Sequence, residues 1–207
     1  MGYLLPTEYV EYGLGPEITD DLVVAASALI ESYCRRPSLL ITQYVERVRL
    51  TTGAQTARLS YRPLAVAESA TSPLAQVRVR FARPRRGDHV DLFHEQVAFA
   101  FSIPGSWSDL DPASVDVNLA NAELTFPSNF LGLDYNEAEI TYTAGLTVVP
   151  PAVKVACAQI VRNIQVMPAM NVKSSRIDTM QMEYFSGSLI DEQVQSLLRP
   201  YVAERLG

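Results

Sequence analysis

The sequence predicts an α+β fold in which a small helical bundle carries a β-rich insertion. Apolar residues recur at helical spacing over residues 20–35 and again over residues 151–167. Between these segments, from 41 to 145, apolar and polar residues alternate and turn-forming residues recur. The 207 residues, 48% of them hydrophobic, are enough for one sizeable core. We therefore expect a helical core from residues 1–40 and 146–207, with residues 41–145 as the insertion.

The two longer helices have start and stop signals. Thr19 is a residue type that caps helix N-termini, and acidic residues follow it in the first turn, where the helix dipole favours negative charge. Pro37 then ends this N-terminal helix. The helix over 151–167 starts with Pro151, which suits a first helical position.

The ends of the chain carry shorter elements. Residues 1–18 contain a candidate for a short helix. Residues 169–188 form a polar arm with a strand-like piece at 179–185. A C-terminal helix is expected from about residue 190, with Asp191 as its cap.

The middle of the chain is expected to be a series of short strands separated by turns. The strand over 55–61 is expected to return along 41–50, and the strands over 115–119 and 122–126 to pair with each other. One strand or more is expected within 90–103. The remaining expected strands are residues 76–81 and 137–143.

Composition and charge limit the function classes. The net charge is −6, from 23 acidic and 17 basic residues. A protein that grips DNA normally carries a basic footprint, so the whole chain is not a general polyanion-binding protein. Charged residues make up only 19% of the sequence, which suggests some surface that partner chains cover.

Cys34 and Cys157 both fall in expected helices and are too few for a disulfide scaffold. We expect two reduced, buried thiols, with a single disulfide as the alternative. Residues 1–6 lack the basic and apolar regions of a secretory signal. No stretch approaches the roughly 20 apolar residues of a membrane span. We therefore expect a soluble protein made in the cytoplasm.

The chain lacks the sequence motifs of a nucleophile elbow or a phosphate-binding loop, so we expect no catalytic residue and no cofactor. The densest group of ionisable residues is Asp88, His89, Asp91 and His94. These residue types bind divalent metals, which leaves a small metal-dependent enzyme as an alternative. Their spacing fits no zinc-site pattern. The competing interpretation is solvated charge at the start of a strand.

One basic cluster stands out, formed by Arg78, Arg80, Arg83, Arg85 and Arg86. It is interpreted in three ways: as charge that blocks pairing at a strand edge, as a contact for an acidic partner, or as a contact for DNA phosphates. Aromatic residues that would stack on bases are sparse here, which argues against sequence-specific nucleic-acid recognition.

An aromatic pair, Tyr184 and Phe185, interrupts the polar arm. Such a pair either docks on another surface or folds back on the chain's own core.

Three groups of segments, taken in order, resemble the head–tail connector (adaptor) proteins of tailed bacteriophages. The first is an alanine-rich helix that ends in Tyr-Cys-Arg. The second is a strand ending in Thr-Ala-Gly, followed by a helix that starts after Val-Pro-Pro. The third is the closing arm with a Leu-Leu-Arg-Pro-Tyr helix. The first group is residues 20–37, and the second is residues 138–145 together with 149–157. The third is residues 172–178 together with 182–184 and 194–201. Residues 60–135 depart from the family pattern because they are longer than in its compact members.

The resemblance implies a helical bundle that assembles side by side into a dodecameric ring in the neck of a virion. One face of the ring would dock on the portal protein, the other would receive a stopper or tail-completion protein, and DNA would pass through the lumen. Assembly would take place in the cytoplasm of the host bacterium. The family has no catalytic residues. Another virion protein, such as a tail-completion or minor capsid subunit, is the alternative.

The arm, the final helix and the basic cluster supply the candidate partner-contact residues. They are Arg83, Arg85, Arg86, Tyr184, Phe185, Leu197, Leu198 and Tyr201.

Overall fold

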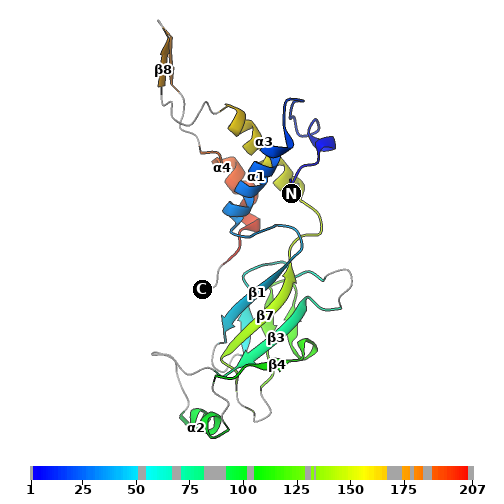
Figure 1. Ribbon diagram of the computed structural model, residues 1–207, viewed down its shortest axis with the longest axis vertical. Helices are drawn as coiled ribbons and strands as arrows, with labels where there is room; N and C mark the ends of the chain where they lie inside the picture. The colour runs from blue at the N-terminus through cyan, green and yellow to red at the C-terminus, as the bar shows by residue number, and fades with distance from the viewer. Residues whose placement is uncertain are drawn as a thin grey trace. The chain divides into compact units, whose positions relative to one another are not determined.

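A computed structural model gives the fold of the chain in two compact units (Figure 1). We call Met1–Pro37 with Val148–Val202 the helical unit, and Ser38–Thr147 with Ala203–Gly207 the β unit. The structure describes residues 2–50, 55–66, 71–81, 92–101, 105–128, 132, 134–166, 174–177, 180–183 and 188–204. No helix within these ranges is long and apolar enough to cross a bilayer.

The helical unit is built around α3 (Pro151–Val166), which packs against both α1 (Asp20–Cys34) and α4 (Glu192–Leu198). The two longer helices confirm the predicted segments to within one residue at each end. Each helix buries one apolar stripe, as the helical spacing requires. The fully buried apolar residues include Val23, Ala26 and Ile30 on α1, Val153, Ala156 and Ile160 on α3, and Val194 and Leu198 on α4.

α1 ends as its sequence predicts but begins without the expected side-chain cap. Thr19 occupies the N-cap position, yet its side chain makes no capping hydrogen bond. At the other end Arg35 takes a left-handed conformation with φ 55°. The backbone N–H of Arg36 then donates to the Glu31 carbonyl at 3.1 Å, which satisfies one of the orphan carbonyl groups of the last turn.

The helix expected within residues 1–18 is reduced to one 3-10 turn, η1 (Pro6–Glu8). Proline and glycine follow too closely for a longer helix. The segment is still anchored to the helices. Ser27 on α1 accepts a hydrogen bond from the backbone N–H of Tyr3 at 2.9 Å. Lys154 on α3 forms an ion pair with Glu8.

The β unit contains two antiparallel sheets. The larger has the strand order β1-β7-β3-β4, formed by β1 (Thr42–Arg49), β7 (Glu137–Ala144), β3 (Leu74–Arg80) and β4 (Ser108–Leu110). The smaller has the order β2-β6-β5, formed by β2 (Thr56–Arg58), β6 (Glu123–Thr125) and β5 (Asp116–Asn118). The strand β7, last of these along the chain, therefore lies between β1 and β3 (Figure 1).

Side-chain alternation gives the larger sheet one buried face. On β7 the residues Ala138, Ile140 and Tyr142 are fully buried, and Val77 and Val79 on β3 are buried beside them. A polar group also reaches this face: Glu46 on β1 accepts hydrogen bonds from Ser60 and from the Tyr142 hydroxyl. These bonds satisfy a carboxylate that would otherwise be costly to place near the core.

The predicted architecture, a helical bundle with a β-rich insertion, is wrong. The described chain is mixed and mostly β, with few helices and with strands β1 to β7 forming two antiparallel sheets. The reason is that the strands enclose a hydrophobic core of their own, which includes Tyr44, Leu59, Leu124 and Phe126. A segment with its own core is a folding unit and does not depend on helices to bury its apolar face.

Two strand predictions also fail. The strand β2 is present within 55–61, but it pairs with β6 and not with β1. Residues expected to hold a strand within 90–103 form the helix α2 (Leu92–Ala100). Leucine, glutamate, glutamine and alanine favour helix, and β-branched residues are few there. The predicted pairing of 115–119 with 122–126 is confirmed by β5 and β6, which the 3-10 turn η2 (Pro112–Ser114) precedes.

Candidate assembly interface

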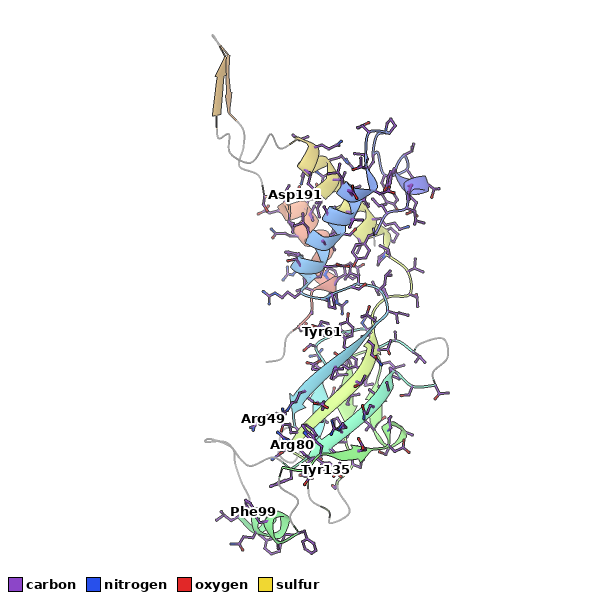
Figure 2. All side chains as sticks on the ribbon, viewed as in Figure 1. Arg49, Tyr61, Arg80, Phe99, Tyr135 and Asp191 are labelled. Carbon is purple, nitrogen blue, oxygen red and sulfur yellow. The ribbon has the colours of Figure 1, made fainter. Side chains whose placement is uncertain are left out.

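The helices on either side of the arm, α3 and α4, are tied together near the start of α4. Asn163 on α3 donates through Nδ2 to the Leu189 carbonyl at 3.1 Å and to Asp191 Oδ2 at 3.2 Å. Gln159 donates to Asn163 Oδ1 at 3.0 Å, which orients the Asn163 amide. Figure 2 labels Asp191 where α4 begins.

Asp191 has two roles at this junction. Its Oδ1 accepts from the backbone N–H of Val194 at 2.8 Å, which caps α4 as predicted. Its Oδ2 accepts from Asn163 on α3. Below the cap, Val194 and Leu198 are fully buried. Among the described residues, the α3–α4 contact is therefore closed by hydrogen bonds and apolar side chains of these helices and of the residues just before α4.

The described part of the arm is a hairpin of β8 (Ser174–Ile177) and β9 (Met180–Glu183). These strands form a separate two-stranded antiparallel sheet. The strand-like piece predicted at 179–185 thus corresponds to β9. A two-stranded hairpin alone is marginally stable in water, and it gains stability when further strands or another surface join it.

The register divides the hairpin residues between two faces. Ile177 lies opposite Met180, and Ser175 opposite Met182, so these four residues share one face. Ser174 lies opposite Glu183, and Arg176 opposite Gln181, and these residues share the other face. One face is thus mostly apolar and the other polar and charged.

The candidate contact residues predicted from the sequence fall in different places. Arg83, Arg85, Arg86, Tyr184 and Phe185 lie outside the described residues.

The other three candidates lie at the C-terminal end of the helical unit. Leu197 on α4 and Tyr201 in the 3-10 turn η3 (Arg199–Tyr201) are half-buried. Leu198 is fully buried and belongs to the helical core, so its side chain supports folding.

Arg78 and Arg80 do not lie on a strand edge, because β3 has β7 on one side and β4 on the other. They point to the face of the sheet opposite the core. Arg80 Nε donates to Glu137 Oε2 at 2.6 Å, and Arg47 Nε on β1 donates to the other oxygen of Glu137 at 2.6 Å. Figure 2 shows Arg80 at the same end of the sheet as Arg49. The interpretation that these charges block pairing at a strand edge is therefore wrong for Arg78 and Arg80.

Trp107, just before β4, covers this group of charges. The Cζ atoms of Arg47, Arg78 and Arg80 lie 5.3, 5.6 and 4.5 Å from the centre of its ring, which is cation–π distance. Burial alone would raise the pKa of Glu137, but the hydrogen bonds from Arg47 and Arg80 outweigh it and hold that pKa below its ordinary value. These arginines are thus engaged within the chain.

The sequence contained a signal for this charge layer that the prediction missed. Basic residues alternate at 47/49 and 78/80, and acidic residues alternate at 137/139. Opposite charges with period two on three strands indicate neighbouring strands in register.

The two cysteines lie on helices α1 and α3 of the helical unit. Both cysteines are free and buried, as predicted, and burial raises the pKa of the Cys34 and Cys157 thiols to about 11. At neutral pH they are protonated and poor nucleophiles.

The candidate metal ligands are largely outside the described ranges. Asp88, His89 and Asp91 lie there, while His94 lies on helix α2, where a strand was expected. Within the described residues no group of three His, Cys, Asp or Glu side chains is placed to hold a metal ion.

No protein-family model matches the chain, and a search of curated proteins finds no match.

Proposed function

We propose that this chain is a structural subunit of a head–tail connector in a tailed bacteriophage or phage-like particle. Copies would form a ring, dodecameric in the family that the sequence resembles, between the portal protein and a stopper or tail-completion protein. DNA would pass through the lumen. The protein would act by fitting surfaces together and would need no cofactor.

The observation that carries this proposal is the closed base of the arm. Asn163 and Asp191 join α3 to α4 directly, so the described contacts between these helices are made by residues outside the arm. The described part of the arm is an antiparallel strand pair whose register places mostly apolar residues on one face. A hairpin of this kind suits a contact with another molecule, where it gains the support that the isolated sheet lacks.

The test is to remove the arm while keeping α4. Deleting everything from residue 169 onward would also remove Val194 and Leu198 from the core. Such a variant would lose binding because it folds poorly, which would not test the arm. A variant with residues 169–187 replaced by a short Gly-Ser linker keeps the Asn163–Asp191 closure. We expect it to fold with nearly unchanged stability but to lose ring formation and binding to portal rings.

A second variant, with residues 174–183 replaced by Gly and Ser at equal length, separates the role of the hairpin from that of arm length. Binding of either variant to portal rings at the wild-type level would contradict the proposal. Cryo-electron microscopy of particles gives an independent check: density for this chain away from the neck would indicate a different virion protein.

A further inference from the structure

The two outer edges of the β8–β9 hairpin point to how copies contact one another. We propose that β8 of one copy pairs with β9 of the next, so that the hairpins of neighbouring copies form one continuous antiparallel sheet around the ring. This inference rests on the proposed function, because it requires a ring of copies. The partner surface is a second copy of the same hairpin.

The first argument is the backbone. In the part of the chain that the structure describes, the sheet of β8 and β9 has only these two strands. Each strand therefore has one edge whose N–H and C=O groups lack a strand partner within that sheet. Such an edge is a template for pairing with another chain, and a closed ring of strands removes every edge.

The second argument is direction. β8 and β9 are antiparallel, so a β8 strand placed beside the β9 strand of its neighbour continues the up-and-down order. The contact uses two different surfaces, β9 on one copy and β8 on the next. A head-to-tail contact of this type forms a ring when the rotation between copies closes after a whole number of subunits.

The third argument is charge. β8 carries Arg176 and no acidic residue, whereas β9 carries Glu183 and no basic residue. Both residues lie on the polar face. With the hairpin's own register repeated between copies, the Arg176 position of one copy is diagonal to the Glu183 position of the next.

The same charges disfavour the alternative pairings. Two copies related by a two-fold axis would place β8 beside β8, with Arg176 near Arg176, or β9 beside β9, with Glu183 near Glu183. Like charges across neighbouring strands are destabilising. The hairpin thus favours head-to-tail contact over a symmetric dimer.

Cysteine cross-linking of the full-length chain tests the strand order. Ser175 and Met182 lie opposite each other in the hairpin register, so Ser175 of one copy would lie opposite Met182 of the next. S175C and M182C are made as separate chains, mixed and oxidised, and examined as denatured products. Cys34 and Cys157 are buried and stay out of the reaction.

We expect covalent dimers from the mixture and none from either variant alone. Dimers from S175C alone or M182C alone would indicate like-with-like pairing and would overturn the inference. The same holds if the mixture assembles but gives no dimers.

Charge reversal supplies a second readout with an internal control. Arg176→Glu and Glu183→Arg should each weaken assembly by about two- to five-fold per contact at low salt, and the double variant should restore it. Arg58→Glu on β2, an exposed residue of the β unit, is the matched control and should leave assembly unchanged.

The mass of the wild-type chain in solution, measured alone and with portal rings, distinguishes failure of the strand-pairing inference from failure of the connector proposal. If the wild-type chain forms a ring and the charge-reversal variants assemble equally well, the proposed strand contact is contradicted and the connector proposal is not. A wild-type chain that forms no ring in either condition overturns both.

Discussion

At the residue scale, Gly145 shows how close backbone approach selects a residue type. Its φ is 131°, and its N–H donates to the Pro63 carbonyl at 3.0 Å. A Cβ added there would lie 2.4 Å from the Leu40 carbonyl oxygen, which is backbone and cannot swing away. The glycine that follows β7 is therefore required by packing as well as by φ.

Gly145→Ala should lower the free energy of unfolding of the β unit by about 1–3 kcal/mol from backbone strain, with the clash against Leu40 adding to it. Gly105→Ala is the matched control, because Gly105 also has a positive φ, of 91°, but nothing lies within 4 Å of an added Cβ. Chemical denaturation measures both variants. Equal losses would show that φ alone matters at Gly145.

Glu137 makes the stability of the β unit depend on pH. Its pKa is held below the ordinary 4.5, so its ionised form stabilises the fold at pH above about 4.5. That contribution is lost as the pH falls through the lower, folded-state pKa. Glu137→Gln should reduce the free energy of unfolding by about 2–3 kcal/mol at pH 7. It should also flatten the dependence of that free energy on pH at values below about 4.5.

Glu139→Gln is the control for that change. The Glu139 side chain is 32% exposed and lies 3.2 Å from Arg78, so its loss should cost less than about 1 kcal/mol. Fluorescence of Trp107, the single tryptophan, follows the same layer of charges. An unchanged pH profile in the Glu137 variant would contradict the assignment.

At the scale of elements, the sequence predicted the helices and strands whose apolar residues recur with a strict period. β7 alternates buried Ala138, Ile140 and Tyr142 with polar residues, and α3 keeps one apolar stripe, so both were found nearly to the residue. Residues 92–101 fit neither period, because Leu92 and Phe93 are adjacent and Phe99 and Phe101 alternate. The helix there was missed for that reason.

Contacts between distant elements were not predictable in the same way. β2 was placed beside β1 by adjacency, whereas its partner β6 is set by the shared core that contains Ala57 and Leu124. The Arg47–Glu137 pair joins residues 90 positions apart. For the interface, local patterns marked the arm and the Asp191 cap, but the Asn163 closure follows only from tertiary packing.

The junction of α3 and α4 predicts coupled side chains. Asp191→Ala should cost about 1–2 kcal/mol through the lost cap of α4, and Asn163→Ala about 1 kcal/mol. Because the two side chains bond each other at 3.2 Å, the double variant should cost less than the sum by about 0.5–1 kcal/mol. Gln193→Ala, at an exposed position of α4, is the control. Additive effects of the substitutions at positions 163 and 191 would argue against a direct link between these two side chains.

At the scale of the whole molecule, the chain has two units with separate apolar interiors. The core of the β unit includes Ile140 and Val77, while that of the helical unit includes Ile160, Val23 and Leu198. The proposed connector subunit would need several distinct surfaces, since it would meet its neighbours on two sides and other proteins on two further faces. Two separately cored units in one chain supply such surfaces without requiring one large core.

Separate cores predict two unfolding transitions by calorimetry, because a chain with two units departs from all-or-none behaviour. Ile160→Ala and Ile140→Ala remove the same number of atoms from fully buried positions, one in each unit. Each should cost about 2–5 kcal/mol, and each should shift one transition while leaving the other in place. Hydrogen exchange then assigns the transitions, since amides of α3 should lose protection with the first variant and amides of β7 with the second. A single transition that both substitutions shift equally would mean that the cores unfold as one, and the arm variants would then have to be judged against the stability of the entire chain.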